Sequence, residues 1–163
     1  MSRSDEIAGR VHRAYAWGRG GQVHYRRSGP PGARSPLLLI HGAQNGGETF
    51  EAFMSDMGRE RSVIAPDLPG TGMSDALKGA GDAGALADAL LEVVAELGLG
   101  MVDVLAVADG GEIAVEMARQ QPDVVRKLIL VSAPAPVGLL SQPTVSLAAA
   151  VFSAASVRDF LDR

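Results

Sequence analysis

The chain has 163 residues, of which 47% are hydrophobic, with a net charge of −4 and a pI near 5.3, values that suit one domain with a buried core. This weakly acidic balance argues against a nucleic-acid-binding protein, whose surface carries clustered basic residues. The sequence has no cysteine, which excludes disulfides and thiolate metal ligands, and no metal site is expected.

The ends of the chain carry no targeting or membrane signal. The first six residues, Met-Ser-Arg-Ser-Asp-Glu, lack the apolar core of a signal peptide, which favours a cytoplasmic protein. The longest run without charge, residues 128–157, contains Pro134, Pro136 and Pro143 and is therefore a poor membrane span. We expect neither a membrane nor a nucleic acid as partner.

The N-terminal third predicts an arm, a hairpin and a buried strand. Residues 1–10 are expected to be a flexible arm. Side-chain character alternates over residues 10–17 and 22–27, with a glycine-rich turn between them, and this pattern predicts a hairpin. The wholly apolar run Pro36–Ile40 predicts a strand buried on both faces of a parallel sheet.

Helical and strand patterns alternate along the middle of the chain. Apolar residues recur at helical spacing from Phe50 to Met57, and residues 62–65 predict a second buried strand. Asp82 is an N-cap signal for a further helix that Gly98 is expected to end.

The alternation continues toward the C-terminus. Residues 102–107 predict a strand, residues 110–121 a helix and residues 127–131 another strand, and the uncharged segment 144–155 is rich in helix formers. A hairpin followed by alternating strands and helices indicates an α/β layer sandwich with a mainly parallel sheet.

The segment Val104–Gly111 has the frame of a nucleophile elbow, in which a strand turns sharply into a helix. The tight backbone requires small residues two positions before and after the nucleophile, and Ala106 and Gly110 meet this requirement. The central residue is then Ala108, which has no nucleophilic atom. A serine replaced on purpose and a natural protein without a nucleophile both account for this alanine.

A frame shifted by one residue would instead make Asp109 a carboxylate nucleophile. That frame places Val107 where the turn needs a small residue, so the frame centred on Ala108 is preferred. Asp109 then follows the nucleophile position, where a backbone N–H contributes to an oxyanion hole.

Four local sequences, taken in order, resemble those of the N-terminal half of an α/β-hydrolase-fold enzyme. They are Leu-Leu-Ile-His-Gly at residues 38–42, Asp-Leu-Pro-Gly-Thr-Gly-Met-Ser at 67–74, Asp-Gly-Gly at 109–111, and the segment 122–131 that leads into a strand. The resemblance covers roughly residues 20–135. It implies a three-layer sandwich that lacks the last strands of the family's sheet. Residues 11–135 would form the front half of this core, and residues 136–163 the start of a lid or cap, or interface helices.

The resemblance also implies a set of site residues. The backbone N–H groups of Ala43 and Asp109 would form the oxyanion hole beside Ala108, the substituted nucleophile position. His41, Gly42 and Gln44 would bind the substrate, with a loop-ordering hydrogen bond as the other role for His41.

The catalytic triad of the family is incomplete in this sequence. The family order is nucleophile, acid and then histidine, but the three histidines, His12, His24 and His41, all precede the elbow. After Val131 the only acids are Asp159 and Asp162.

The implied function is an α/β-hydrolase-like protein with an oxyanion-hole site for a small carbonyl or carboxylate ligand. Its ancestral reaction would be ester or acyl hydrolysis, inactive as a serine hydrolase in this form, and no cofactor is expected. A lyase- or cyclase-type enzyme using the same pocket and a non-catalytic binding pseudoenzyme are the alternatives. Because strand 127–131 would be a bare apolar edge, a complementary C-terminal chain or a homo-oligomer is expected as partner.

Overall fold

The chain opens with a β-hairpin in the computed structural model, which describes residues 9–18, 20–32, 34–133, 147–148 and 154–163. β1 (His12–Gly18) and β2 (Gly21–Ser28) are antiparallel, with Gly18 opposite Gly21. The predicted hairpin is confirmed. The predicted arm lies outside the described residues up to residue 8.

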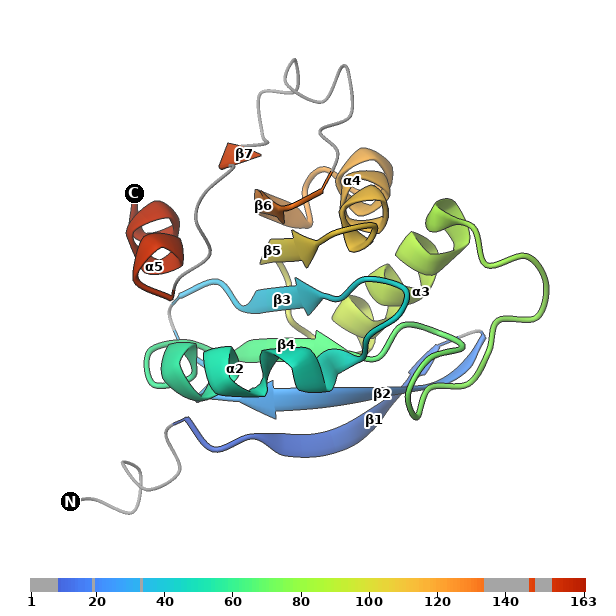
Figure 1. Cartoon of the computed structure of the whole chain (residues 1–163), viewed down its shortest axis with the longest axis horizontal. Coiled ribbons are helices and arrows are strands. Elements are labelled where there is room, and N and C mark those ends of the chain that lie inside the picture. The colour runs from blue at the N-terminus through green and yellow to red at the C-terminus, as the bar shows by residue number, and fades with distance from the viewer. Residues whose placement is uncertain (1–8, 19, 33, 134–146, 149–153) are drawn as a thin grey trace.

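A mainly parallel sheet forms the centre of the molecule (Figure 1). In the described part of the chain it has seven strands in the order β1-β2-β4-β3-β5-β6-β7. The strands after the hairpin are β3 (Leu37–Ile40), β4 (Val63–Pro66), β5 (Val102–Val107), β6 (Val125–Val131) and β7 (Leu147–Ala148). β2 is antiparallel to β4, and every later pair of neighbours is parallel. β3, β4 and β5 therefore end at the same edge of the sheet.

Helices cover both faces of this sheet. They are the short 3-10 helix η1 (Gly47–Phe50), α2 (Glu51–Met57), α3 (Ala83–Glu96), α4 (Gly110–Gln120) and α5 (Ala154–Asp162). α3 and α4 share one apolar cluster with the sheet, and α2 and α5 share another on the opposite face (Figure 1). The predicted α/β-hydrolase-like three-layer sandwich is confirmed.

The helix start and stop signals in the sequence are confirmed as well. The Asp82 carboxylate accepts a hydrogen bond from the Ala85 amide at 2.8 Å and caps α3. Gly98 follows the end of this helix with a φ of +60°. On the other face, Phe50 and Met57 are buried as their spacing predicts.

The helix predicted over residues 144–155 is wrong at Leu147 and Ala148. These two residues form β7, opposite Leu128 and Ile129 of β6. Pairing with a buried strand overrides the helix propensity of this segment. The same pairing gives β6 a neighbour at two positions, so the edge that the sequence predicts to be bare is covered there. The rest of the segment up to residue 153 lies outside the described residues.

α5 packs against the sheet near the amino ends of β5 and β6. Val157 and Leu161 are buried in the same cluster as α2. Lys127 at the start of β6 donates hydrogen bonds to the Phe160 and Leu161 carbonyls at 2.9 and 3.1 Å, which satisfies the C-terminal turn of the helix. The described end of the predicted 136–163 segment is thus a helix packed on the sheet. That residues 136–163 begin a lid remains a prediction.

A buried charge network lies at the same amino edge of the sheet, opposite the elbow. Asp103 on β5 is fully buried and accepts hydrogen bonds from Arg61 at 3.1 Å and from Arg126 at 2.8 and 2.6 Å. Asp162 on α5 binds Arg61 at 3.0 Å and Arg34 at 3.1 Å. The network links strands β5 and β6 to α5. Sequence reasoning missed it, although a carboxylate within the apolar run of β5 was its signal.

Candidate active site

A tight turn joins β5 to α4 and holds Ala108 at its apex. Ala108 has a φ of +49°, a left-handed conformation that residues with a side chain rarely adopt. Its amide donates to the Val131 carbonyl at 3.0 Å, and its own carbonyl accepts from the Gly111 amide at 3.0 Å. Asp109 has an ordinary φ of −66°. This geometry supports the frame centred on Ala108 over the frame centred on Asp109.

Two glycines allow the elbow to approach the loop that follows β3. A Cβ atom on Gly110 would lie 2.5 Å from the backbone oxygen of His41, which real Cβ atoms do not tolerate. A Cβ atom on Gly42 would lie 2.7 Å from the Asp109 carboxylate and 3.4 Å from the Ala108 methyl group. The predicted hole residues are therefore brought together from two distant segments of the chain.

The Asp109 side chain bridges these two loops. Its Oδ1 atom accepts a hydrogen bond from the Ala43 amide at 2.9 Å, across 66 residues of sequence. Both residues are exposed, as are Ala108 and Gln44. One of the two predicted backbone donors is thus bound to an oxygen of the protein itself. The sequence pointed only to the backbone of Asp109, and no local pattern signals its side-chain contact.

His41 is fully buried, with both ring nitrogens engaged within the chain. Nε2 accepts a hydrogen bond from the Leu68 amide at 2.9 Å, and Nδ1 donates to the Gly42 carbonyl at 2.7 Å. These partners assign the proton to Nδ1. This geometry supports the loop-ordering role, because a contact with a ligand would require breaking one of these bonds.

The loop after β4 is pinned by two of its own side chains, those of Asp67 and Ser74. Asp67 is 1% exposed, and its carboxylate accepts from the Gly47 amide at 2.8 Å and the Met73 amide at 3.1 Å. The Ser74 hydroxyl donates to the Asp67 carbonyl at 2.7 Å. The loop is therefore held to the segment that follows β3, on the side of the sheet where the elbow lies.

Two side chains from β2 complete the surroundings of Asp67. His24 Nδ1 lies 2.8 Å from Oδ2 and the Arg26 guanidinium 2.9 Å from Oδ1. Burial by itself would raise the pKa of Asp67. The amide hydrogen bonds from Gly47 and Met73, the His24 bond and the Arg26 charge together lower this pKa by more than burial raises it. The net pKa lies below the ordinary value, so Asp67 is a firmly ionised anchor. No local pattern in the sequence signals either partner.

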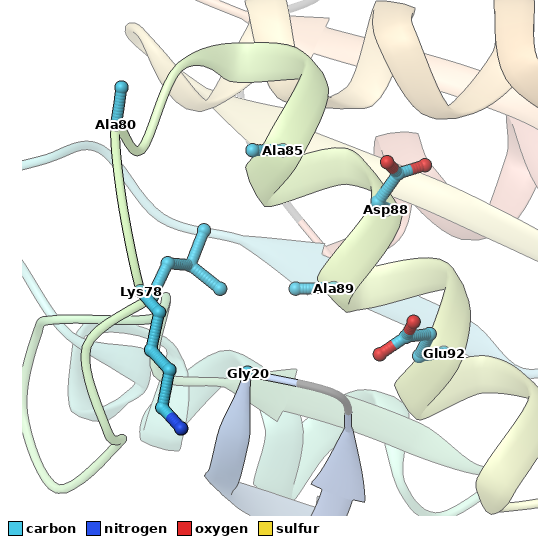
Figure 2. A pocket seen from close by; sticks show the side chains of 8 residues that line it. Gly20, Lys78, Ala80, Ala85, Asp88, Ala89 and Glu92 are labelled. Carbon is cyan, nitrogen blue, oxygen red and sulfur yellow. The ribbon is translucent and has the colours of Figure 1, made fainter.

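A cavity of about 270 Å³ lies away from the elbow, between the hairpin turn, the loop around Lys78 and helix α3 (Figure 2). Asp88 and Glu92 line it from α3, and Lys78 lines it from the loop (Figure 2). None of the predicted site residues lines this cavity. The strained turn at Ala108 and the contact of its loop with Ala43 make the elbow the better candidate for chemistry.

Neither a metal site nor a membrane span is found in the described part of the chain. No three His, Cys, Asp or Glu side chains among the described residues are grouped as metal ligands would be. Within the same residues, no helix has the length and apolar character needed to cross a bilayer. The candidate site therefore consists of the elbow, the His-Gly loop and the side chains between them.

Similarity to known proteins agrees with this fold. The family model described as the alpha/beta hydrolase fold matches residues 35–163. An uncharacterised protein of Mycobacterium tuberculosis is 34% identical over 113 residues, which are 68% of this chain and 33% of that protein. The chain spans about a third of the length of that relative.

Solved structures of hydrolases are also similar. The epoxide hydrolase CorEH aligns with a TM-score of 0.71 and 26% identity, over 80% of this chain and 48% of its own. The N-acyl homoserine lactonase AidH aligns with a TM-score of 0.70 and 31% identity, over 77% of this chain and 46% of its own. Fold, element order and family model agree: the chain belongs to the α/β hydrolase fold family.

Proposed function

We propose that the elbow is a small-molecule site of hydrolase ancestry, with ester or acyl hydrolysis as its ancestral reaction and without serine-hydrolase activity in this form. The observation that carries the proposal is Ala108, held at a φ of +49° between β5 and α4. Backbone strain of this kind persists where a function uses the geometry. Here the strained apex has a methyl group where covalent catalysis needs an oxygen.

The surroundings of the apex support an oxyanion hole. The Ala43 amide points toward the elbow and already binds a negatively charged oxygen, that of Asp109. This carboxylate oxygen occupies the place that a substrate oxyanion would take. The site lies at the N-terminus of α4, where free N–H groups and the helix dipole favour negative charge.

The ligand class follows from the hole rather than from the similar proteins. CorEH is named for epoxides and AidH for an acyl lactone, so these similar structures differ in the bond they cleave. Backbone N–H donors bind the oxygen of a carbonyl, and we propose a small carbonyl compound as ligand.

A non-catalytic binding protein is the second candidate, because Ala108 leaves the elbow without a nucleophile. A lyase- or cyclase-type enzyme would use the same hole without a covalent step. The three functions differ in what happens to a bound ester. They predict acylation of a restored nucleophile, turnover by the alanine form, or binding alone.

Replacement of Ala108 by serine tests the proposal. With p-nitrophenyl acetate, Ala108→Ser is expected to release about one equivalent of p-nitrophenol and to carry one acetyl group at position 108, because the hole contributes even without a histidine base. The unmodified chain is expected to show neither adduct nor burst. Ser132 is the internal control, since it is also exposed and has a φ of +52°.

Mass spectrometry of the peptides separates the outcomes. An adduct at position 108 and none at Ser132 supports acyl chemistry at the elbow. Equal modification of both serines, or none, contradicts it. Turnover of the ester by the alanine form favours the enzyme without a covalent step, and saturable ligand binding without acylation favours the binding protein.

A further inference from the structure

We propose that Asp109 determines ligand specificity at the elbow: its carboxylate occupies the Ala43 amide, keeps anionic ligands out and favours uncharged carbonyl ligands. The proposal rests on the proposed function, because it concerns the same oxyanion hole. It goes further by assigning the ligand's charge to one side chain.

The first observation is the unusual orientation of this side chain. Asp109 stands at the N-cap of α4, where an aspartate ordinarily accepts a hydrogen bond from its own helix. No such capping bond is formed. The carboxylate reaches across to the Ala43 amide instead, at 2.9 Å. The start of α4 therefore lacks a side-chain cap, and the Asp109 carboxylate lies in the proposed hole.

The second observation is the space around that carboxylate. Gly42 lies so close that a Cβ atom there would be 2.7 Å from Asp109 Oδ1. A glycine at position 42 therefore leaves room for this oxygen, and a larger residue would displace it. A ligand oxygen that is to bind the Ala43 amide must take the same place.

The charge of Asp109 decides which ligand can do so. Asp109 is exposed, so its side chain can turn away at low cost when a neutral carbonyl replaces it. A carboxylate ligand would be placed beside a like charge that has only moved aside, which disfavours binding. Glu112, in the first turn of the same helix, adds negative charge, and its exposed side chain forms no ion pair within the described residues.

The test compares benzamide and benzoate, which share a shape and differ in charge. Binding is followed by amide chemical shifts of the whole 163-residue chain. For the unmodified chain we expect benzamide to bind more tightly than benzoate. Asp109→Ala is expected to raise the affinity for benzoate about tenfold or more, and the affinity for benzamide by less.

Two further variants separate charge from shape. Asp109→Asn removes the charge and keeps an oxygen that can accept from Ala43, so an intermediate gain for benzoate is expected. Glu112→Gln removes the same charge from the same helical turn and is expected to change benzoate affinity less than twofold. The Ala43 amide resonance should move in both Asp109 variants and stay in place in Glu112→Gln.

The outcomes distinguish this proposal from the proposed function. If benzoate shifts the amides of residues 43 and 109 equally well in the unmodified chain and in Asp109→Ala, the selective role of Asp109 is wrong and the hole stands. If Glu112→Gln gains as much as Asp109→Asn, general charge explains the effect and the proposal fails. If neither ligand moves those two amides in any variant, the hole is absent and both proposals fail.

Discussion

At the scale of single residues, Ala108 holds a conformation that a glycine would adopt without strain. Left-handed backbone geometry costs a residue with a Cβ atom about 1–2 kcal/mol, and at 108 no nucleophile gains from it. The turn persists because the sheet hydrogen bond to Val131 and the first turn of α4 over-determine it. The residue is thus held in place by its neighbours.

Ala108→Gly is therefore expected to stabilise the protein by about 0.5 kcal/mol, because relief of strain exceeds the entropy that glycine adds to the unfolded chain. Urea unfolding followed by circular dichroism measures this difference. The control is Ala114→Gly, a buried position within α4, which should destabilise by about 1 kcal/mol. A loss of stability in Ala108→Gly comparable to the control would show that the turn is not strained.

At the scale of elements, the junction of α4 with the loop after β3 depends on contact between backbones. Gly110 begins the helix directly against the His41 carbonyl, and Gly111 lies as close to the Ala133 side chain. A backbone oxygen cannot move aside as a flexible side chain can. The helix and the loop must therefore separate if Gly110 gains a Cβ atom, and a Cβ atom on Gly111 would push α4 away from Ala133 instead.

Gly110→Ala is expected to lower the free energy of unfolding by about 2 kcal/mol, because its Cβ atom would lie 2.5 Å from the His41 oxygen. Gly84→Ala in the first turn of α3 is the matched control, since its nearest atom would be at 3.4 Å. Alanine there should raise stability by about 0.5–1 kcal/mol. Two equal effects would contradict the close approach at the elbow.

The loop after β4 makes the stability of the folded protein depend on pH. The pKa of Asp67 lies below its ordinary value in the folded protein, so its contribution is complete above the unfolded pKa of about 3.9 and is lost as the pH falls through the folded value. Urea unfolding at pH 6, 4 and 3 should show a decline over the lowest interval.

Substitution of Asp67 provides the check on this pH dependence. Asp67→Asn should cost about 3 kcal/mol at pH 6, because the buried Arg26 loses its only buried acidic partner among the described residues and keeps the more exposed Glu51 and Glu48, and should flatten the decline at low pH. Asp75→Asn, on the same loop but exposed, should leave that decline unchanged. An unchanged decline in Asp67→Asn would place its origin elsewhere.

Elements with local signals could be predicted from the sequence, and contacts between distant residues could not. The runs at β3 and β4, the Asp82 cap and the frame around Ala108 each depend on residues within a few positions of one another. The contact of Asp109 with Ala43 spans 66 residues and depends on a side-chain orientation. Leu147 and Ala148 likewise follow β6 rather than their own helix propensity.

At the scale of the whole molecule, the two ends of the parallel strands differ in character. The carboxyl ends carry the open elbow and its loops, and the amino ends carry the buried Asp103 network and α5. The amino ends are therefore packed by buried contacts, and the candidate site lies at the carboxyl ends. Changes at the elbow should leave the far end of the sheet intact.

The outer edge of β6 is the basis of the expected partner. In the described part of the chain, β7 pairs with only two residues of the seven-residue β6. We propose that a second copy or a complementary C-terminal chain pairs along the remaining edge. Sedimentation velocity of the purified chain should then show a coefficient that rises with concentration. A folded monomer at high micromolar concentration would contradict this.

The ion pair between Arg34 and Asp162 of α5 affects the rate at which the protein unfolds. The Arg34–Asp162 contact joins two residues that are 128 positions apart in the sequence. A loop of that length is expected to close only after the sheet has formed. Interactions absent from the folding transition state act on the rate of unfolding. Asp162→Asn should accelerate unfolding about fivefold and leave the refolding rate unchanged, as measured by stopped-flow fluorescence of Trp17. Asp159→Asn is the control and should alter neither rate, because within the described residues the Asp159 side chain pairs with the exposed Arg163 alone. α5 would then slow unfolding and thereby lengthen the lifetime of the folded chain.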